Sequence, residues 1–147
     1  MKKFVFTLQA LLNYKLTLER VQKADLSVAE AALRALLEED RRLDEAFEES
    51  TRSLEKALES GYAVIERLRE HDAYFIYIRE EKERLSVEIE KAEAERDRLR
   101  EILVRTMKEI KTYNKLRREQ YERYLKEVAA EEEKAISDLV SFRAGSN

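Results

Sequence analysis

The sequence contains no cysteine, no proline and no tryptophan, and its only glycines are Gly61 and Gly145. Without cysteine, the chain has neither a disulfide framework nor a thiolate metal site. A globular fold with many turns needs residues that tolerate positive φ or fix φ in advance, and this chain has hardly any of them. These absences argue against a compact fold that is built from many short elements.

Long apolar runs and a large net charge are also missing. No stretch of about 18 apolar residues occurs, so no segment is predicted to span a membrane. Charged residues make up 41% of the 147 residues, yet the net charge is only −3, which argues against a general nucleic-acid-binding protein. A composition rich in Ala, Glu, Lys, Leu and Arg is typical of long helices and coiled coils.

Two series of residues follow the heptad spacing of a coiled coil, in alternating steps of three and four. The first series runs through Leu26, Ala29, Leu33, Leu36, Asp40, Leu43, Phe47, Ser50, Leu54, Ala57, Gly61, Val64 and Leu68. The second runs through Phe75, Ile78, Lys82, Leu85, Ile89, Ala92, Arg96, Leu99, Leu103, Thr106, Ile110 and Tyr113. Each series is a predicted seam between helices, in which the few polar members set the register.

Two seams in one chain predict an all-α, antiparallel two-helix coiled-coil hairpin that forms a single domain over residues 1–147. We expect the first helix over about 4–59, the tip or turn over about 60–73 and the second helix over about 74–142. Gly61 opens the turn window, and Asp72 is the predicted N-cap of the second helix. If the chain folds back near residue 70, residue i lies opposite residue 140 − i.

No pattern in the chain predicts chemistry. His71 is the only histidine and has no cysteine partners, so we interpret it as a solvent-facing turn residue and not as a metal ligand. Two glycines cannot supply a phosphate-binding loop, and acidic runs such as 131–133 are interpreted as a solvated helix face. A two-helix hairpin offers no water-excluding pocket, so we predict no catalytic, metal or cofactor residue, no small-molecule ligand and no enzyme activity.

Two surfaces differ from the charged background. Residues 105–126 carry eight basic and three acidic side chains interleaved with tyrosines, whereas residues 38–59 carry nine acidic and four basic ones. The basic stretch is interpreted as a solvated flank, a docking surface for an acidic protein or, as an alternative, a nucleic-acid-binding arm. Tyr62, Tyr74, Phe75 and Tyr77 form an aromatic group near the predicted tip, where exposed aromatic side chains indicate interaction with another protein.

The two ends of the chain resemble the flagellar export protein FliJ family. The N-terminal residues that carry the resemblance are Phe4, Phe6, Leu8, Gln9, Leu11, Leu12, Tyr14, Lys15, Glu19 and Ala24. The C-terminal ones are Tyr113, Lys115, Leu116, Tyr121, Tyr124 and the run Glu131-Glu132-Glu133-Lys134. Members often carry an acidic pair after that run, whereas this chain has Ile136-Ser137-Asp138-Leu139.

The resemblance implies a stalk-like component of the flagellar type III export machine, similar to the central stalk of rotary ATPases. Its implied partners are the export ATPase hexamer, the membrane export gate and export chaperones, and its implied place is the cytoplasm, in peripheral association with the inner membrane. The ATPase contact is expected at Phe4, Leu8, Leu12, Lys115, Arg117, Arg118 and Tyr121, and the gate contact at Tyr62, Tyr74, Phe75 and Tyr77. The stalk of a virulence type III secretion system and a self-associating structural coiled coil remain alternatives.

Overall fold

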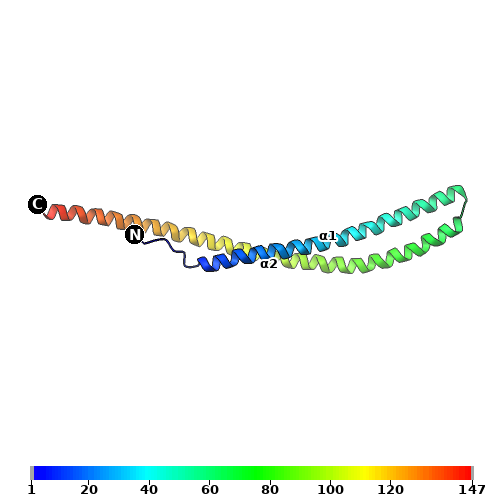
Figure 1. Cartoon of the computed structure of the whole chain (residues 1–147), viewed down its shortest axis with the longest axis horizontal. Coiled ribbons are helices and arrows are strands. Elements are labelled where there is room, and N and C mark those ends of the chain that lie inside the picture. Colours follow the sequence, from blue (N-terminus) through cyan, green and yellow to red (C-terminus); the bar gives the residue numbers. More distant parts are fainter. Residues whose placement is uncertain (1, 147) are drawn as a thin grey trace. The chain divides into compact units, whose positions relative to one another are not determined.

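The computed structural model describes residues 2–146, which form two helices joined by a short turn (Figure 1). Helix α1 spans Gln9–Ser60, helix α2 spans Val64–Gly145, and no strand occurs within residues 2–146. The predicted all-α class with two long helices packed against each other is confirmed. Residues 1 and 147 of the predicted domain lie outside the described residues.

The chain divides into two compact units, and each contains a segment of α1 beside a segment of α2. Unit 1 comprises residues 1–21 and 102–147, and unit 2 comprises residues 22–101 with the turn. Such a pairing of two distant segments follows from two seams in one chain, since each seam buries its apolar face on the other.

The heptad seams form the core of unit 2. Every member of the first seam from Leu26 to Ala57 is buried or half-buried, as is every member of the second seam from Ile78 to Leu99. Leu85 is fully buried, with 0% of its surface exposed. The predicted seam positions are therefore confirmed over these ranges, because heptad spacing keeps one face of each helix turned toward the partner.

The turn between the helices is only three residues long. α1 ends at Ser60 because Gly61 has a φ of 71°, a left-handed conformation that costs glycine little. The amide of Gly61 donates to the carbonyl of Ala57 at 2.9 Å, which is the bond of a helix C-cap with one left-handed residue. Ala63 also has positive φ, 55°, and the amide of Arg67 donates to its carbonyl at 3.1 Å in the first turn of α2.

The structure corrects the expected turn over 60–73. α2 begins at Val64 and continues without a break through Asp72, the predicted N-cap. Residues 64–73 contain neither glycine nor proline, and Glu66 in the first turn favours a helix start through the helix dipole. Nothing in this segment stops a helix, so a single glycine at 61 defines the turn.

The earlier turn also changes the register. Within unit 2, Phe47 lies beside Phe75 and Asp40 lies beside Lys82, so numbers on opposite helices add to about 122. The expected pairing of residue i with 140 − i is therefore wrong. Residues that face each other lie equally far along the chain from the middle of the turn, so their numbers add to about twice the number of the middle residue. Moving the turn toward the N-terminus therefore lowers this sum by about twice the displacement.

Unit 1 contains a second cluster of buried side chains. Phe6, Leu12 and Ile110 are buried, and the partly buried side chains Phe4, Leu8, Leu16, Tyr113 and Leu116 pack against them. The first helix, expected from about residue 4, begins at Gln9, and residues 2–8 form a non-helical lead-in segment. Phe4, Phe6 and Leu8 alternate with exposed residues, which is the period of an extended chain and not of a helix.

Candidate protein-binding surfaces

A basic hollow lies on unit 1 where the lead-in segment crosses α2. Its volume is about 520 Å³, and it is lined by Phe4, Asn114, Arg117, Arg118 and Tyr121. The lining holds two guanidinium groups and no carboxylate. Such a hollow fits an acidic side chain of another protein, because each guanidinium offers a fork of donors to a carboxylate.

Aromatic contacts fix the lead-in segment above this hollow. The ring of Phe4 meets the ring of Tyr121 edge-on at a centroid distance of 5.1 Å and lies 5.6 Å from that of Tyr124. The hydroxyl of Tyr124 donates to the carbonyl of Lys2 at 2.6 Å. The segment is thus held by ring packing and one hydrogen bond, which places Phe4 at the edge of the basic hollow.

The predicted ATPase-contact residues divide into exposed and supporting ones. Lys115, Arg117 and Arg118 are exposed on α2, and 45% of Tyr121 is exposed. Leu8 is half-buried and Leu12 is buried with 4% exposed, so Leu12 positions the lead-in segment and cannot itself contact a partner. The structure therefore brings four of the seven residues, Phe4, Arg117, Arg118 and Tyr121, to one accessible surface, and Lys115 is exposed but does not line the hollow.

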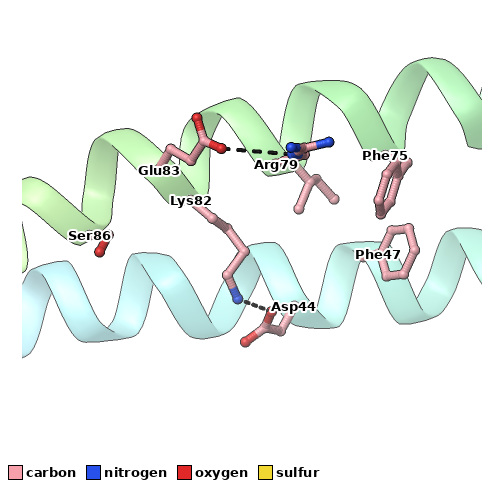
Figure 2. Close-up of a pocket in the computed structure, with 8 residues that line it drawn as sticks. Asp44, Phe47, Phe75, Arg79, Lys82, Glu83 and Ser86 are labelled. Carbon is pink, nitrogen blue, oxygen red and sulfur yellow. Dashed lines mark hydrogen bonds and ion pairs between the residues drawn. The ribbon is translucent and has the colours of Figure 1, made fainter.

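An aromatic groove lies between α1 and α2 in unit 2. Its volume is about 390 Å³, and it is lined by Asp44, Phe47, Phe75, Ile78, Arg79, Lys82, Glu83 and Ser86. Figure 2 shows the rings of Phe47 and Phe75 facing each other across the two helices, and their centroids are 5.7 Å apart. The apolar floor flanked by charged side chains is suited to one inserted apolar side chain of a partner.

The four predicted gate-contact residues do not form one cluster. Tyr62 lies in the turn and is 83% exposed, while Tyr74, Phe75 and Tyr77 lie about 15 Å further along α2 at 1.5 Å per residue. The rings of Tyr74 and Tyr77 stack with centroids 6.0 Å apart, and Phe75 packs on Phe47. Sequence analysis missed Phe47 as a groove residue, because the wrong register separated it from Phe75.

His71 has a different environment from the predicted one. It lies inside α2 and is half-buried, and its Nδ1 is 3.0 Å from the hydroxyl oxygen of Ser50. Its ring stacks on Phe47 with a centroid distance of 5.1 Å. The interpretation as a solvent-facing turn residue is therefore wrong, and His71 is a packing partner of the first seam. Residues 2–146 contain no group of three or more potential metal ligands.

An ion-pair network crosses the helices beside the aromatic groove. The ammonium of Lys82 pairs with the carboxylate of Asp44, as Figure 2 shows, and lies 3.7 Å from that of Asp40. The hydrogen bond with Asp44 raises the pKa of Lys82, partial burial opposes the shift, and the charge of Asp40 adds to it. Asp40 and Lys82 are two of the polar seam residues that were predicted to set the register, and they pair with each other in the observed register.

We expect Lys82→Glu to lower the free energy of unfolding by about 1 kcal/mol at low salt, because a third carboxylate then faces Asp40 and Asp44. The double variant with Asp44→Lys is expected to recover most of this loss. Thermal unfolding followed by circular dichroism measures both effects. A double variant no more stable than Lys82→Glu alone would contradict the pairing.

The sign of the pH dependence follows from the raised pKa of Lys82. The pair stabilises the fold below the ordinary lysine value of 10.5, and its contribution is lost as the pH rises through the raised pKa. The difference in stability between the native chain and Lys82→Met is therefore expected to be constant near neutral pH and to shrink in alkaline solution.

No helix within residues 2–146 combines the length and the apolar character that crossing a membrane requires. Two packed helices with heptad seams place the chain in the class of coiled-coil proteins. The basic hollow and the aromatic groove are its candidate binding surfaces. A family model described as "Flagellar FliJ protein" matches residues 4–147, almost the whole chain. The chain belongs to this family, so the predicted resemblance is confirmed.

Membership makes the chain a component of the flagellar protein export apparatus, in a family whose role there is non-catalytic. The family also implies interaction with the export machinery. No curated protein and no solved structure gave a significant match.

Proposed function

We propose that the chain is a non-enzymatic stalk and adaptor that binds and stimulates the export ATPase ring and links it to the membrane export gate and to export chaperones. It acts in the cytoplasm, in peripheral association with the inner membrane through the export apparatus. The basic hollow is the single observation that carries the ATPase contact, since two adjacent guanidinium groups without a carboxylate neighbour in the lining favour an acidic protein surface.

The aromatic groove supports a second contact, with the export gate. Phe75 and Tyr77 are each about half exposed and belong to unit 2, whereas the basic hollow belongs to unit 1. Partly exposed aromatic side chains beside a shallow groove are typical anchors of protein interfaces. Separate surfaces allow one chain to hold two partners at the same time.

The ATPase contact is tested with the purified ATPase hexamer and the full chain. We expect the double variant Arg117→Glu and Arg118→Glu to bind the ATPase about tenfold more weakly or worse and to lose most of its stimulation. Arg105→Glu is the matched control, because it reverses an exposed charge of α2 outside the hollow. Affinity of the native chain is expected to fall as salt rises, and the double variant should lose that dependence.

The gate contact is tested in the same preparation. Phe75→Ala combined with Tyr77→Ala is expected to spare ATPase binding and to weaken gate binding by about 1–3 kcal/mol. Helicity must be unchanged in every variant, which circular dichroism verifies. The assignment is overturned if the aromatic variant loses the ATPase, or if the basic variant loses only the gate.

A further inference from the structure

The apolar face of α2 loses its cover within unit 1 beyond Tyr124. The lead-in segment reaches that point through the carbonyl of Lys2, and every described residue from 129 to 146 is exposed. Figure 1 shows this end of α2, coloured orange to red, with no other segment beside it. Among its apolar side chains, Leu139 is 56%, Ile136 64% and Phe142 74% exposed.

These exposed side chains continue the heptad spacing of a seam. Leu125, Val128, Glu132, Ala135, Leu139 and Phe142 follow one another in alternating steps of three and four, and Ile136 widens the same face. We call residues 125–142 on this face the C-terminal stripe. A sustained heptad spacing on one helix is filled by the side chains of a second helix.

Charges beside the C-terminal stripe define the chemistry of that second helix. Residues 126–138 contain five carboxylates, Glu127, Glu131, Glu132, Glu133 and Asp138, against two lysines. Within residues 126–146, all of which the structure describes, none of these carboxylates forms an ion pair. Lys or Arg on a partner helix would therefore find acceptors that are not already paired.

The same charges disfavour a second copy of this chain. In a parallel, in-register pair Glu132 would face Glu132 of the other copy inside the seam. In an antiparallel pair centred on the stripe, Glu131 would flank Asp138 of the other copy. Like charges at seam and flanking positions destabilise such pairs, so the occupant differs from the chain itself.

A membrane surface is disfavoured on similar grounds. Helices that lie on membranes carry Lys and Arg on their polar face, because cytoplasmic leaflets are negatively charged. The polar flank of the stripe is predominantly acidic instead. Its heptad spacing is that of a helix–helix seam.

We infer that the C-terminal stripe is a docking face for a partner protein helix that is amphipathic, with apolar residues at heptad spacing and Lys or Arg beside them. This site is independent of the proposed ATPase contact, because it shares no residue with the basic hollow. In the complex, the C-terminal end of α2 is one helix of a coiled coil and the partner helix is the other.

The test uses the full chain and two synthetic helical peptides of about three heptads, with Leu at the seam positions. One peptide carries Lys at the flanking positions and the other Glu. Titration by fluorescence anisotropy is expected to show binding of the Lys peptide and at least tenfold weaker binding of the Glu peptide. Hydrogen exchange should show new protection over residues 128–142 with the Lys peptide.

Two variants locate the binding. Leu139→Gln combined with Phe142→Gln is expected to lower the affinity of the chain for the Lys peptide about tenfold or more. Leu58→Gln, which alters an exposed leucine of α1, should leave this affinity unchanged. Glu131→Lys combined with Asp138→Lys should reverse the preference between the two peptides. Exposed positions of this kind leave stability nearly unchanged, so the variants report binding.

Four outcomes would overturn the inference. These are equal binding of both peptides, Lys-peptide binding that survives the Leu139 and Phe142 substitutions, adsorption of the chain to phosphatidylglycerol vesicles through the stripe, and a dimer in sedimentation that those substitutions abolish. Because no ATPase is present, failure here is separable from failure of the Arg117 and Arg118 test.

Discussion

Substitution of Leu85 by aspartate is expected to unfold unit 2. Leu85 is the one side chain of residues 2–146 that is both large and fully buried, and it is a member of the second seam. A buried carboxylate without a partner costs several kcal/mol, and the lost packing of leucine adds about 2–5 kcal/mol. The sum is comparable to the whole stability of a typical domain, about 5–15 kcal/mol.

Thermal unfolding followed by circular dichroism measures this effect. Val87→Asp is the matched control, because Val87 lies on the same helix and is about half exposed. We expect the control to melt within a few degrees of the native chain. Similar melting of the two variants would show that the seam has been assigned to the wrong face of α2.

Phe6→Ala is expected to release the lead-in segment from α2. Phe6 is buried at 5% exposure beside Leu12 and Ile110, and replacing a buried phenylalanine by alanine costs about 3–5 kcal/mol. The other contacts of the segment, the packing of Phe4 on Tyr121 and Tyr124 and the hydrogen bond of Tyr124 to Lys2, are expected to offset only part of this loss. Release would also remove Phe4 from the edge of the basic hollow.

Hydrogen exchange at the start of α1 reports this release. The amide of Gln9 donates to the carbonyl of Phe6 at 3.1 Å, and that of Leu12 to the carbonyl of Leu8 at 2.9 Å. Both amides are expected to exchange at least tenfold faster in Phe6→Ala, while Val5→Ala, which alters an exposed neighbour, should leave them unchanged. Unchanged exchange in Phe6→Ala would mean that Phe6 does not hold the segment.

Sequence analysis predicted the fold class and most seam positions, because heptad spacing is a direct consequence of burying one face of a helix. It misplaced the turn. Gly61 lay within the predicted window, but the sequence around 69–72 resembles a helix end and a cap as much as a continuous helix. The two positive φ values in the turn, at Gly61 and Ala63, are tertiary information, since alanine alone does not predict a left-handed residue.

The prediction of the candidate surfaces depended on which residues of the N-terminal part of the chain lie beside which residues of α2. Arg117 and Arg118 were visible in a run of basic residues and Phe4 was predicted with them, but Phe4 reaches the hollow only because residues 2–8 do not continue α1. The alternation of Phe4, Phe6 and Leu8 was the available signal for an extended segment. The aromatic groove needed the pairing of Phe47 with Phe75, which follows only after the turn is placed at residues 61–63.

The three-residue turn has a consequence for the order in which the helices assemble. Ser50 and His71, which are in contact near the turn, are only 21 positions apart in the sequence, whereas Lys2 and Tyr124 are 122 positions apart. Loop-closure entropy rises with the logarithm of the separation, so the distant contact costs about 1.5 kcal/mol more to form directly. Zipping from the turn avoids most of this entropy loss at each step, because every new pair extends an already closed loop. The contact of Lys2 with Tyr124 is therefore expected to form last during folding and to open first.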